Sequence, residues 1–260
     1  MQENPSRGRP DPRVGTGRVL KLVVAYDGTE FKGWQRLPGK ARTVQGFLEA
    51  ALGRVLGEAV EASGAGRTDA GVHAEGQVAS VPTGSGKSLE RILRSLDGDL
   101  PPDLAVLFAE DAEPRFHARY RATGKLYRYR LQVGARPDPF AARYALRVAD
   151  ALDRGAMRSV AAALVGRRDF SAFTNAKGDK SATRELRAVR VVERGDFLDL
   201  EFEGDGFLRN QARIMAGALV EAGLGRLDAA GVAALLAEGL RAKAPGALEA
   251  KGLCLMKVFY

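Results

Sequence analysis

Strand-like and helix-like segments alternate along this chain, and their order occurs twice. In the first half, residue patterns predict strands over 18–28, 58–66, 75–83 and 104–111 and helices over 41–57 and 88–98. In the second half, they predict strands over 124–133, 183–195, 196–205 and 252–260 and helices over 150–166, 207–223 and 227–239. Each half comes close to the order β-α-β-β-α-β, which is typical of a ferredoxin-like unit.

This order predicts an α+β fold in which two ferredoxin-like halves join into a mainly antiparallel central sheet with helices packed on it. The N-terminal half is expected over residues 18–115 and the C-terminal half over 116–260. Residues 1–17 contain three prolines among three arginines, which indicates a flexible basic leader. The groove between the two halves is the natural place for a site.

The charge balance favours a polyanionic partner. The chain has 40 Lys and Arg against 32 Asp and Glu, a net charge of +8, so nucleic acid is the expected partner. One cysteine and two histidines exclude a disulfide framework and a cysteine-based metal site, so metal dependence is not expected, although carboxylates could still hold a magnesium ion. The first residues lack the apolar region of a secretory signal and no apolar run is long enough to span a membrane, so a cytoplasmic protein is expected.

The segment GAGRTDAGVHA, residues 64–74, is the best candidate for chemistry. It is too long for a hairpin turn, and its glycines allow other groups to approach the backbone. Because the chain has only two histidines, a carboxylate is the expected general base. Asp69 is the best candidate, since it lies between two glycines with Arg67 two residues away. An aspartate that only forms a turn is the alternative.

Two segments of the second half add candidates. Period-two alternation in GKLYRYRLQV places Tyr127 and Tyr129 on one face of a strand and Arg128 and Arg130 on the other. A tyrosine at the start of such a strand can stack on a base, although core packing is the alternative. Arg213, among small and apolar residues of a predicted helix, is expected to be partly buried and to need an anion, for which a carboxylate is the matched partner; a snorkelling surface arginine is the alternative.

The motifs together resemble one family. AYDGTEFKGWQ, TVQGFLE, GRTDAGVHA, FHAR, KLYRYR, FLRNQAR and GLCLMKV occur in the order found in the tRNA pseudouridine synthase A family and span residues 20–260. The resemblance implies the pseudouridine synthase fold and a homodimer that binds the anticodon stem-loop of tRNA. It implies conversion of uridine to pseudouridine at tRNA positions 38, 39 and 40, without cofactor or metal.

The resemblance also assigns roles to residues. It implies that Asp69 is the catalytic nucleophile or base, that Arg213 pairs with its carboxylate, and that Tyr127 lies against the target base. Arg67 is then expected to help expose that base. Arginines around the tyrosine strand, Arg119 and Arg128 among them, are expected to contact RNA phosphates.

Several alternatives stay open at this point. The carboxylate can attack C1′ of the ribose, add to C6 of the uracil or remove a C2′ proton, and the residues do not choose among these. A catalytically silent RNA-binding module explains the same charge and element order. A nuclease with carboxylate-bound metal is a third possibility, and it predicts loss of activity on chelation.

Overall fold

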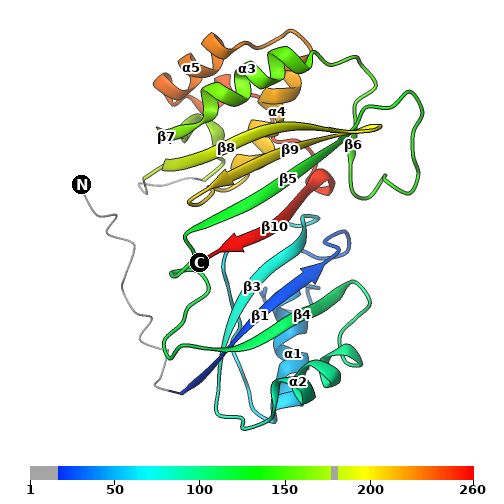
Figure 1. Cartoon of the computed structure of the whole chain (residues 1–260), viewed down its shortest axis with the longest axis vertical. Helices are drawn as coiled ribbons and strands as arrows, with labels where there is room; N and C mark the ends of the chain where they lie inside the picture. The colour runs from blue at the N-terminus through cyan, green and yellow to red at the C-terminus, as the bar shows by residue number, and fades with distance from the viewer. Residues whose placement is uncertain (1–16, 177–180) are drawn as a thin grey trace. The chain divides into compact units, whose positions relative to one another are not determined.

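A computed structural model of the chain describes residues 17–176 and 181–260, which form two compact units (Figure 1). The first unit comprises the described residues up to Thr123 together with Leu255–Tyr260, and the second comprises Gly124–Cys254. The expected basic leader lies outside the described residues, apart from Gly17.

The first unit carries one sheet and two helices. Its elements are β1 (Arg18–Tyr26), α1 (Val44–Leu56), β2 (Ser63–Gly64), β3 (His73–Thr83), α2 (Leu89–Asp97), β4 (Leu104–Ala112) and most of β10 (Leu253–Phe259). Its strands follow the order β4-β1-β3-β10, β2 also pairs with β3, and β1 is antiparallel to both of its neighbours. The last strand of the chain therefore returns to the first unit, beside β3.

Helix α1 begins and ends where local sequence signals predict. The Thr43 hydroxyl accepts a hydrogen bond from the backbone N–H of Gly46, and Gly57 ends the helix in the left-handed conformation. Phe47, on this helix, is 37% exposed. Its ring packs edge-on against Phe31, and the guanidinium of Arg42 lies 4.9 Å from its centroid, so a cation–π contact covers part of it.

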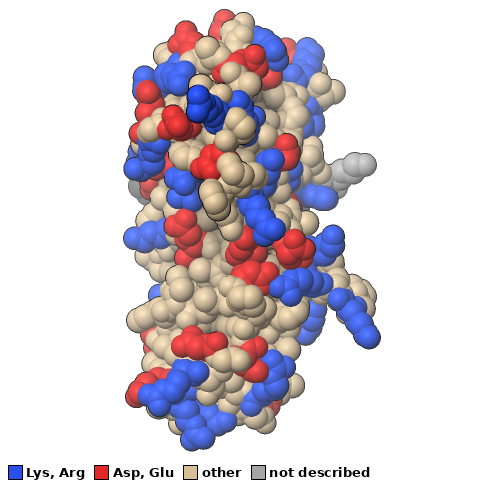
Figure 2. All heavy atoms as spheres, turned by 90° about the vertical axis from the view of Figure 1, so that its right-hand side faces the viewer, with Lys and Arg blue, Asp and Glu red and all other residues tan. Residues whose placement is uncertain are grey.

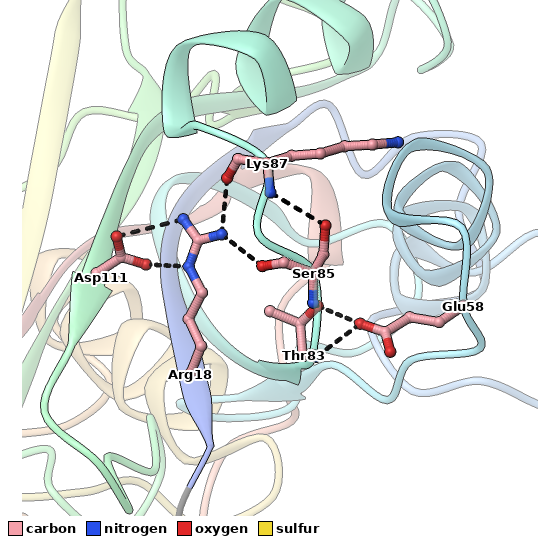
Figure 3. Close-up of polar contacts among 7 residues, drawn as sticks. Arg18, Glu58, Thr83, Ser85, Lys87 and Asp111 are labelled. Atoms are coloured by element: carbon pink, nitrogen blue, oxygen red, sulfur yellow. Dashed lines mark hydrogen bonds and ion pairs between the residues drawn. The ribbon is translucent and has the colours of Figure 1, made fainter.

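Arg18 connects three parts of the first unit (Figure 3). Its Nε and Nη2 donate to the carboxylate of Asp111 on β4, at 2.5 and 3.2 Å. Its Nη1 donates to the backbone carbonyls of Ser85 and Lys87, at 2.8 and 2.7 Å. These two carbonyls belong to the segment between β3 and α2, so one side chain at the start of β1 fixes the path of the chain into α2.

The second unit has the same general build. Its elements are β5 (Gly124–Gln132), β6 (Leu146–Arg147), α3 (Arg154–Leu164), β7 (Gly166–Asp169), β8 (Thr183–Arg194), β9 (Phe197–Gly204), α4 (Gln211–Gly223) and α5 (Ala229–Glu238), with short 3-10 turns at Ser171–Phe173, Arg241–Lys243 and Ala250–Gly252. The strand order is β5-β9-β8-β7, all antiparallel, and the two-residue β6 runs parallel to β5. The predicted α+β class with mainly antiparallel sheet is confirmed.

Alternation along β5 separates the two faces of this sheet, as predicted. Tyr127, Tyr129 and Leu131 are buried and lie opposite Phe202, Leu200 and Leu198 of β9. Helices α3 and α4 pack on one another, α3 also contacts β8, and α4 contacts β5. The apolar residues of β5 and β9 therefore build the core of the second unit, and the intervening residues form a polar face.

Candidate functional site

Asp69 lies in the loop between β2 and β3, here called the aspartate loop (residues 65–72). Asp69 is half-buried and Arg67 is exposed, whereas Thr68 and Val72 are buried. The loop is anchored at its start, where Ala65 N–H donates to the carbonyl of Val78 on β3 at 2.7 Å. The loop thus has buried anchors on both sides of the aspartate, and the carboxylate sits at the edge of solvent.

The aspartate loop is held by hydrogen bonds from a second loop, the supporting segment (residues 28–34). Trp34 N–H donates to the carbonyl of Thr68 at 3.1 Å, and Gly71 N–H donates to the carbonyl of Phe31 at 3.3 Å. The hydroxyls of Tyr26 and Thr68 lie 2.8 Å apart in a buried hydrogen bond. The residues on both sides of Asp69 are therefore tied to the supporting segment and to the end of β1.

Two glycines let the backbones of these loops touch. A Cβ on Gly33 would lie 2.7 Å from the carbonyl oxygen of Thr68 and 3.2 Å from the carbonyl carbon of Asp69, and Gly33 has φ of +97°. A Cβ on Gly28 would lie 2.1 Å from the carbonyl oxygen of Val72. Only glycine fits both the contact and the left-handed conformation at position 33. This is a physical reason for the glycines of the AYDGTEFKGWQ motif.

His73 adds a side-chain contact between the same two regions. Its Nδ1 accepts a hydrogen bond from the backbone N–H of Gly28 at 3.0 Å, and Asp27 Oδ1 lies 3.1 Å from that nitrogen. His73 is buried, and its hydrogen bond to Gly28 links the supporting segment to the residue that follows the aspartate loop.

Tyr127 lies in the second unit, near the start of β5. Its ring is 7% exposed and packs edge-on against Phe207, with 5.0 Å between ring centroids. Tyr129, two residues on, is fully buried; its hydroxyl donates to the carbonyl of Glu249 at 2.8 Å, and burial raises its pKa well above the usual value. Tyr129 is thus a core residue, as expected, and Tyr127 is the one of the two at the edge of the core.

Arg213 lies in the first turn of α4 and is half-buried. Its Nε donates to the carbonyl of Leu248 at 2.6 Å, and the N–H of Leu248 donates back to the Arg213 carbonyl at 3.3 Å. A Cβ on Gly217 would lie 2.7 Å from the carbonyl oxygen of Gly246. The segment that follows α5 therefore packs directly on α4 and orients the guanidinium through its Nε.

Helix α4 begins later than the sequence predicts, at Gln211 and not at Phe207. Asn210 has φ of +61°, a left-handed conformation that asparagine tolerates better than most residues and that interrupts the helix before Gln211. Asn175 Nδ2 donates to Asn210 Oδ1 at 3.0 Å, and Arg241 Nε donates to Asn175 Oδ1 at 2.9 Å. A polar network thus holds Asn210, the residue before the helix starts and three residues before Arg213.

The polar face of the second sheet is a ladder of opposite charges. Asp199 is fully buried and accepts two hydrogen bonds from Arg130, at 2.7 and 2.8 Å, and a third from Arg194 at 3.0 Å. Arg128 lies opposite Glu201 in the strand register. Arg130 is therefore held by a carboxylate of its own unit, although the sequence alone groups it with the other arginines around Tyr127.

The predicted site residues fall into two groups. Asp69, Arg67 and Arg119 belong to the first unit, where Arg119 is exposed and its N–H donates to His117 Nδ1 at 3.1 Å. Tyr127, Arg128 and Arg213 belong to the second unit. The pairing of Asp69 with Arg213 stays a prediction.

Comparisons with known proteins bear on the whole chain. A family model described as tRNA pseudouridine synthase matches residues 22–121 and 160–260. tRNA pseudouridine synthase A 2 of Bacillus cereus is 39% identical over 239 residues, which cover 92% of this chain and 98% of the relative. tRNA pseudouridine synthase A of Geobacter sulfurreducens is 42% identical over 248 residues, and that of Moorella thermoacetica 42% over 243; each alignment covers 93% of this chain and 99% of the relative.

The chain belongs to the tRNA pseudouridine synthase family. Asp69, Arg67, Arg119 and Arg213 lie inside the ranges that the model of this pseudouridine synthase family matches, whereas Tyr127 lies between the two ranges. Within residues 17–176 and 181–260, no group of three or more His, Cys, Asp or Glu side chains is placed to hold a metal ion. In the same part of this family member, no helix is long and apolar enough to cross a membrane.

Sequence reasoning missed the residues that position the aspartate loop. Gly28 and Gly33 are visible in the sequence as turn-forming glycines, but their partners lie about forty residues further along the chain. His73 lies in the quoted motif without a role, because its partner is a backbone N–H. The sequence of this pseudouridine synthase family member does show two glycine-containing motifs, AYDGTEFKGWQ and GRTDAGVHA. Only the fold shows that the first motif supports the backbone of the second.

Proposed function

We propose that this protein isomerises uridine to pseudouridine in the anticodon stem-loop of tRNA, at positions 38, 39 and 40, with Asp69 as the nucleophile or base. The observation that carries the proposal is the aspartate loop, whose backbone is supported on both sides of a half-buried carboxylate, in a chain that belongs to this family. The relatives' names, tRNA pseudouridine synthase A, support tRNA as the substrate.

The reaction breaks the N1–C1′ bond of uridine and forms a C5–C1′ bond with the same uracil. Nothing is oxidised and no group is imported, so a carboxylate and a pocket that retains the detached base suffice. Attack on C1′, addition to C6 and removal of a C2′ proton all need an ionised Asp69. A guanidinium beside a carboxylate favours that ionised state and fixes its orientation, which is the role proposed for Arg213.

The target uridine must leave its stack before Asp69 can reach it. Arg67, exposed two residues before Asp69, is proposed to occupy the vacated place, at an unstacking cost of about a few kcal/mol for the RNA. Tyr127 is proposed to contact the extruded uracil, and its packing on Phe207 supports a fixed ring position. Arg119 and Arg128 are proposed phosphate contacts. Action on tRNA as a cytoplasmic homodimer belongs to the same proposal.

The replacement Asp69→Asn tests the catalytic role. We expect it to abolish tritium release from tRNA labelled at C5 of uridine, while tRNA binding in a filter assay stays within about twofold, because the shape of the side chain is kept. Asp97→Asn, an exposed aspartate at the end of α2, is the matched control and should release tritium at the wild-type rate. Release by Asp69→Asn at the wild-type rate would contradict the proposal.

The same assay separates the alternative functions. Wild-type protein that binds tRNA but releases no tritium from any tRNA would favour the RNA-binding module. Activity that disappears in excess EDTA, with cleaved RNA as product, would favour the metal-dependent nuclease. Mapping of the modified nucleotides after complete reaction tests positions 38, 39 and 40, and modification only elsewhere would overturn that assignment.

A further inference from the structure

The loop between β5 and β6, here called the aromatic loop (residues 133–145), exposes an aromatic ring that packing within the second unit does not explain. Phe140 is 89% exposed, the largest exposed fraction of any large apolar residue described, and Tyr144 on the same loop is 46% exposed. The loop projects from the second unit beyond β6 (Figure 1). It lies between the two ranges matched by the family model.

Hydrogen bonds give the aromatic loop a defined conformation. The Asp138 carboxylate accepts from the N–H of Phe140 at 2.8 Å, and the Asp138 carbonyl accepts from the N–H of Ala141 at 3.2 Å. Ala141 in turn accepts from Tyr144 and Ala145, at 2.8 and 2.9 Å. The loop therefore holds a turn on which Phe140 points to solvent, and ordering it on binding has a small entropic cost.

Basic residues flank the exposed rings in the sequence. Three arginines, Arg136, Arg143 and Arg147, lie in the loop or directly after it, against Asp138, whose carboxylate bonds the loop backbone, and Asp196, which lies against Gly134 at the start of the loop. All three arginines are exposed. Figure 2 shows the side toward which the loop projects in Figure 1, and basic and acidic side chains are intermixed there with uncharged ones. An aromatic ring among cationic side chains fits a single-stranded nucleic acid, whose bases stack and whose phosphates pair with arginine.

We propose that the aromatic loop is an RNA contact in which Phe140 stacks on an unpaired base of bound tRNA and Arg136 contacts an adjacent phosphate. This inference rests on the proposed function for the identity of the RNA. A second copy of the chain fits less well, because two loops with two arginines and one aspartate each carry the same sign of net charge and would repel one another. One phenylalanine also covers only about 150–250 Å², far below the ~1,000 Å² of a stable interface.

Fluorescence gives a direct readout of stacking. The only tryptophan, Trp34, is buried, so Phe140→Trp introduces the only exposed indole. We expect unlabelled tRNA to quench the emission of Phe140→Trp and to leave that of the wild-type protein nearly unchanged. Quenching should be weak with a blunt, fully paired RNA duplex, because its bases are not available for stacking.

Affinity gives the second readout. Phe140→Ala should raise the Kd for tRNA by about fivefold or more, the loss expected for one stacked base, with kcat at saturating tRNA unchanged. Arg136→Gln should weaken binding and reduce the salt dependence of Kd by about one phosphate contact, whereas Phe140→Ala should leave that salt dependence as it is. Leu107→Ala, at the second most exposed of the large apolar residues described (59%) and in the first unit, is the control and should bind like the wild type.

Three outcomes would overturn the inference. An unchanged Kd for Phe140→Ala together with no quenching in Phe140→Trp would remove the stacking contact. A change of oligomeric state in Phe140→Ala without RNA, measured by light scattering, would assign the loop to a second copy. A wild-type protein that binds no tRNA would contradict both the proposed function and the RNA contact of the aromatic loop. If Phe140→Ala weakens tRNA binding but the wild-type protein never releases tritium, only the proposed function is contradicted.

Discussion

The loop that carries Asp69 and the helix end that carries Arg213 are held by different kinds of contact. On either side of Asp69 the bonds from the supporting segment run mostly from backbone to backbone, and Gly28 and Gly33 allow the two loops to touch. Near Arg213 side chains take a larger part: its Nε donates to the Leu248 carbonyl, and Asn175 and Arg241 form a polar network at Asn210, just before the helix starts. Backbone contacts do not depend on which polar side chain is present, but they exclude a Cβ. Side-chain networks tolerate changes of size but lose their bonds when one polar group is removed.

This contrast predicts which replacements will harm each region. In the aspartate loop, the severe ones should be glycine replacements that add a single carbon atom. In the second unit, they should be replacements that delete a carboxylate or an amide.

Gly33→Ala should have the largest effect. The added Cβ would lie 2.7 Å from the Thr68 carbonyl oxygen, so the aspartate loop must move, and a displacement of about 1 Å at a catalytic group can cost about a hundredfold in rate. Tritium-release kinetics measure this loss. Gly39→Ala is the control, because Gly39 also has a positive φ, +78°, but no atom lies within 4 Å of its added Cβ. Equal losses in the two variants would mean that backbone strain, and not the contact with the loop, is responsible.

Asp199→Asn should destabilise the second unit by about 2 kcal/mol. Breaking a buried ion pair typically costs about 3–5 kcal/mol, and the partial exposure of Arg130 and Arg194 allows water to replace part of that loss. Urea unfolding measures the change. Glu201→Gln on the same strand is the control and should shift stability by under about 0.5 kcal/mol, because its ion pairs are long, at 3.8 and 3.9 Å. Equal stability of Asp199→Asn and the wild type would show that this ladder does not support the sheet.

Asn175→Ala should have a smaller effect, on activity more than on stability. It removes two exposed hydrogen bonds, worth together about 1 kcal/mol, and releases Asn210 at the start of α4. We expect kcat to fall by about threefold or more, because Arg213 lies one turn further on. Asn175→Asp keeps the acceptor for Arg241 and should fall in between. A wild-type kcat in both variants would show that the network of Asn175, Asn210 and Arg241 does not affect catalysis.

Glu58→Gln should have the smallest effect, a change in the pH dependence of stability. Glu58 makes side-chain hydrogen bonds in the first unit, the unit in which backbone contacts hold the aspartate loop. Hydrogen bonds from the Thr83 hydroxyl, and then from Gly84 N–H, lower its pKa below the usual 4.5 (Figure 3). A lowered folded-state pKa adds stability above the unfolded value, and that stability is lost as pH falls through the lowered pKa. The stability difference between wild type and Glu58→Gln should therefore shrink below pH 4.5. A difference that grows on acidification would contradict this assignment.

Much of the architecture can be read from local residue patterns. The alternating face of β5 and the order of the helices and longer strands follow from neighbours a few residues apart, whereas the short strands β6 and β7 were not predicted and most of β10 lies in the first unit. The same holds for Asp69 as the candidate catalytic residue, because its motif is continuous in the chain. Such features depend on short-range periodicity and capping, which a linear sequence displays directly.

Contacts between residues far apart in the chain could be identified only from the tertiary structure. Neither the contact of Gly33 with the Asp69 backbone nor the burial of Asp199 between Arg130 and Arg194 leaves a local pattern, since strand register and loop packing bring these residues together. The late start of α4 depends on the bond from Asn175, thirty-five residues away. A sequence lists which charges and glycines a chain has, but which of them meet is settled by long-range pairing, and that is where the chemistry of Asp69 receives its support.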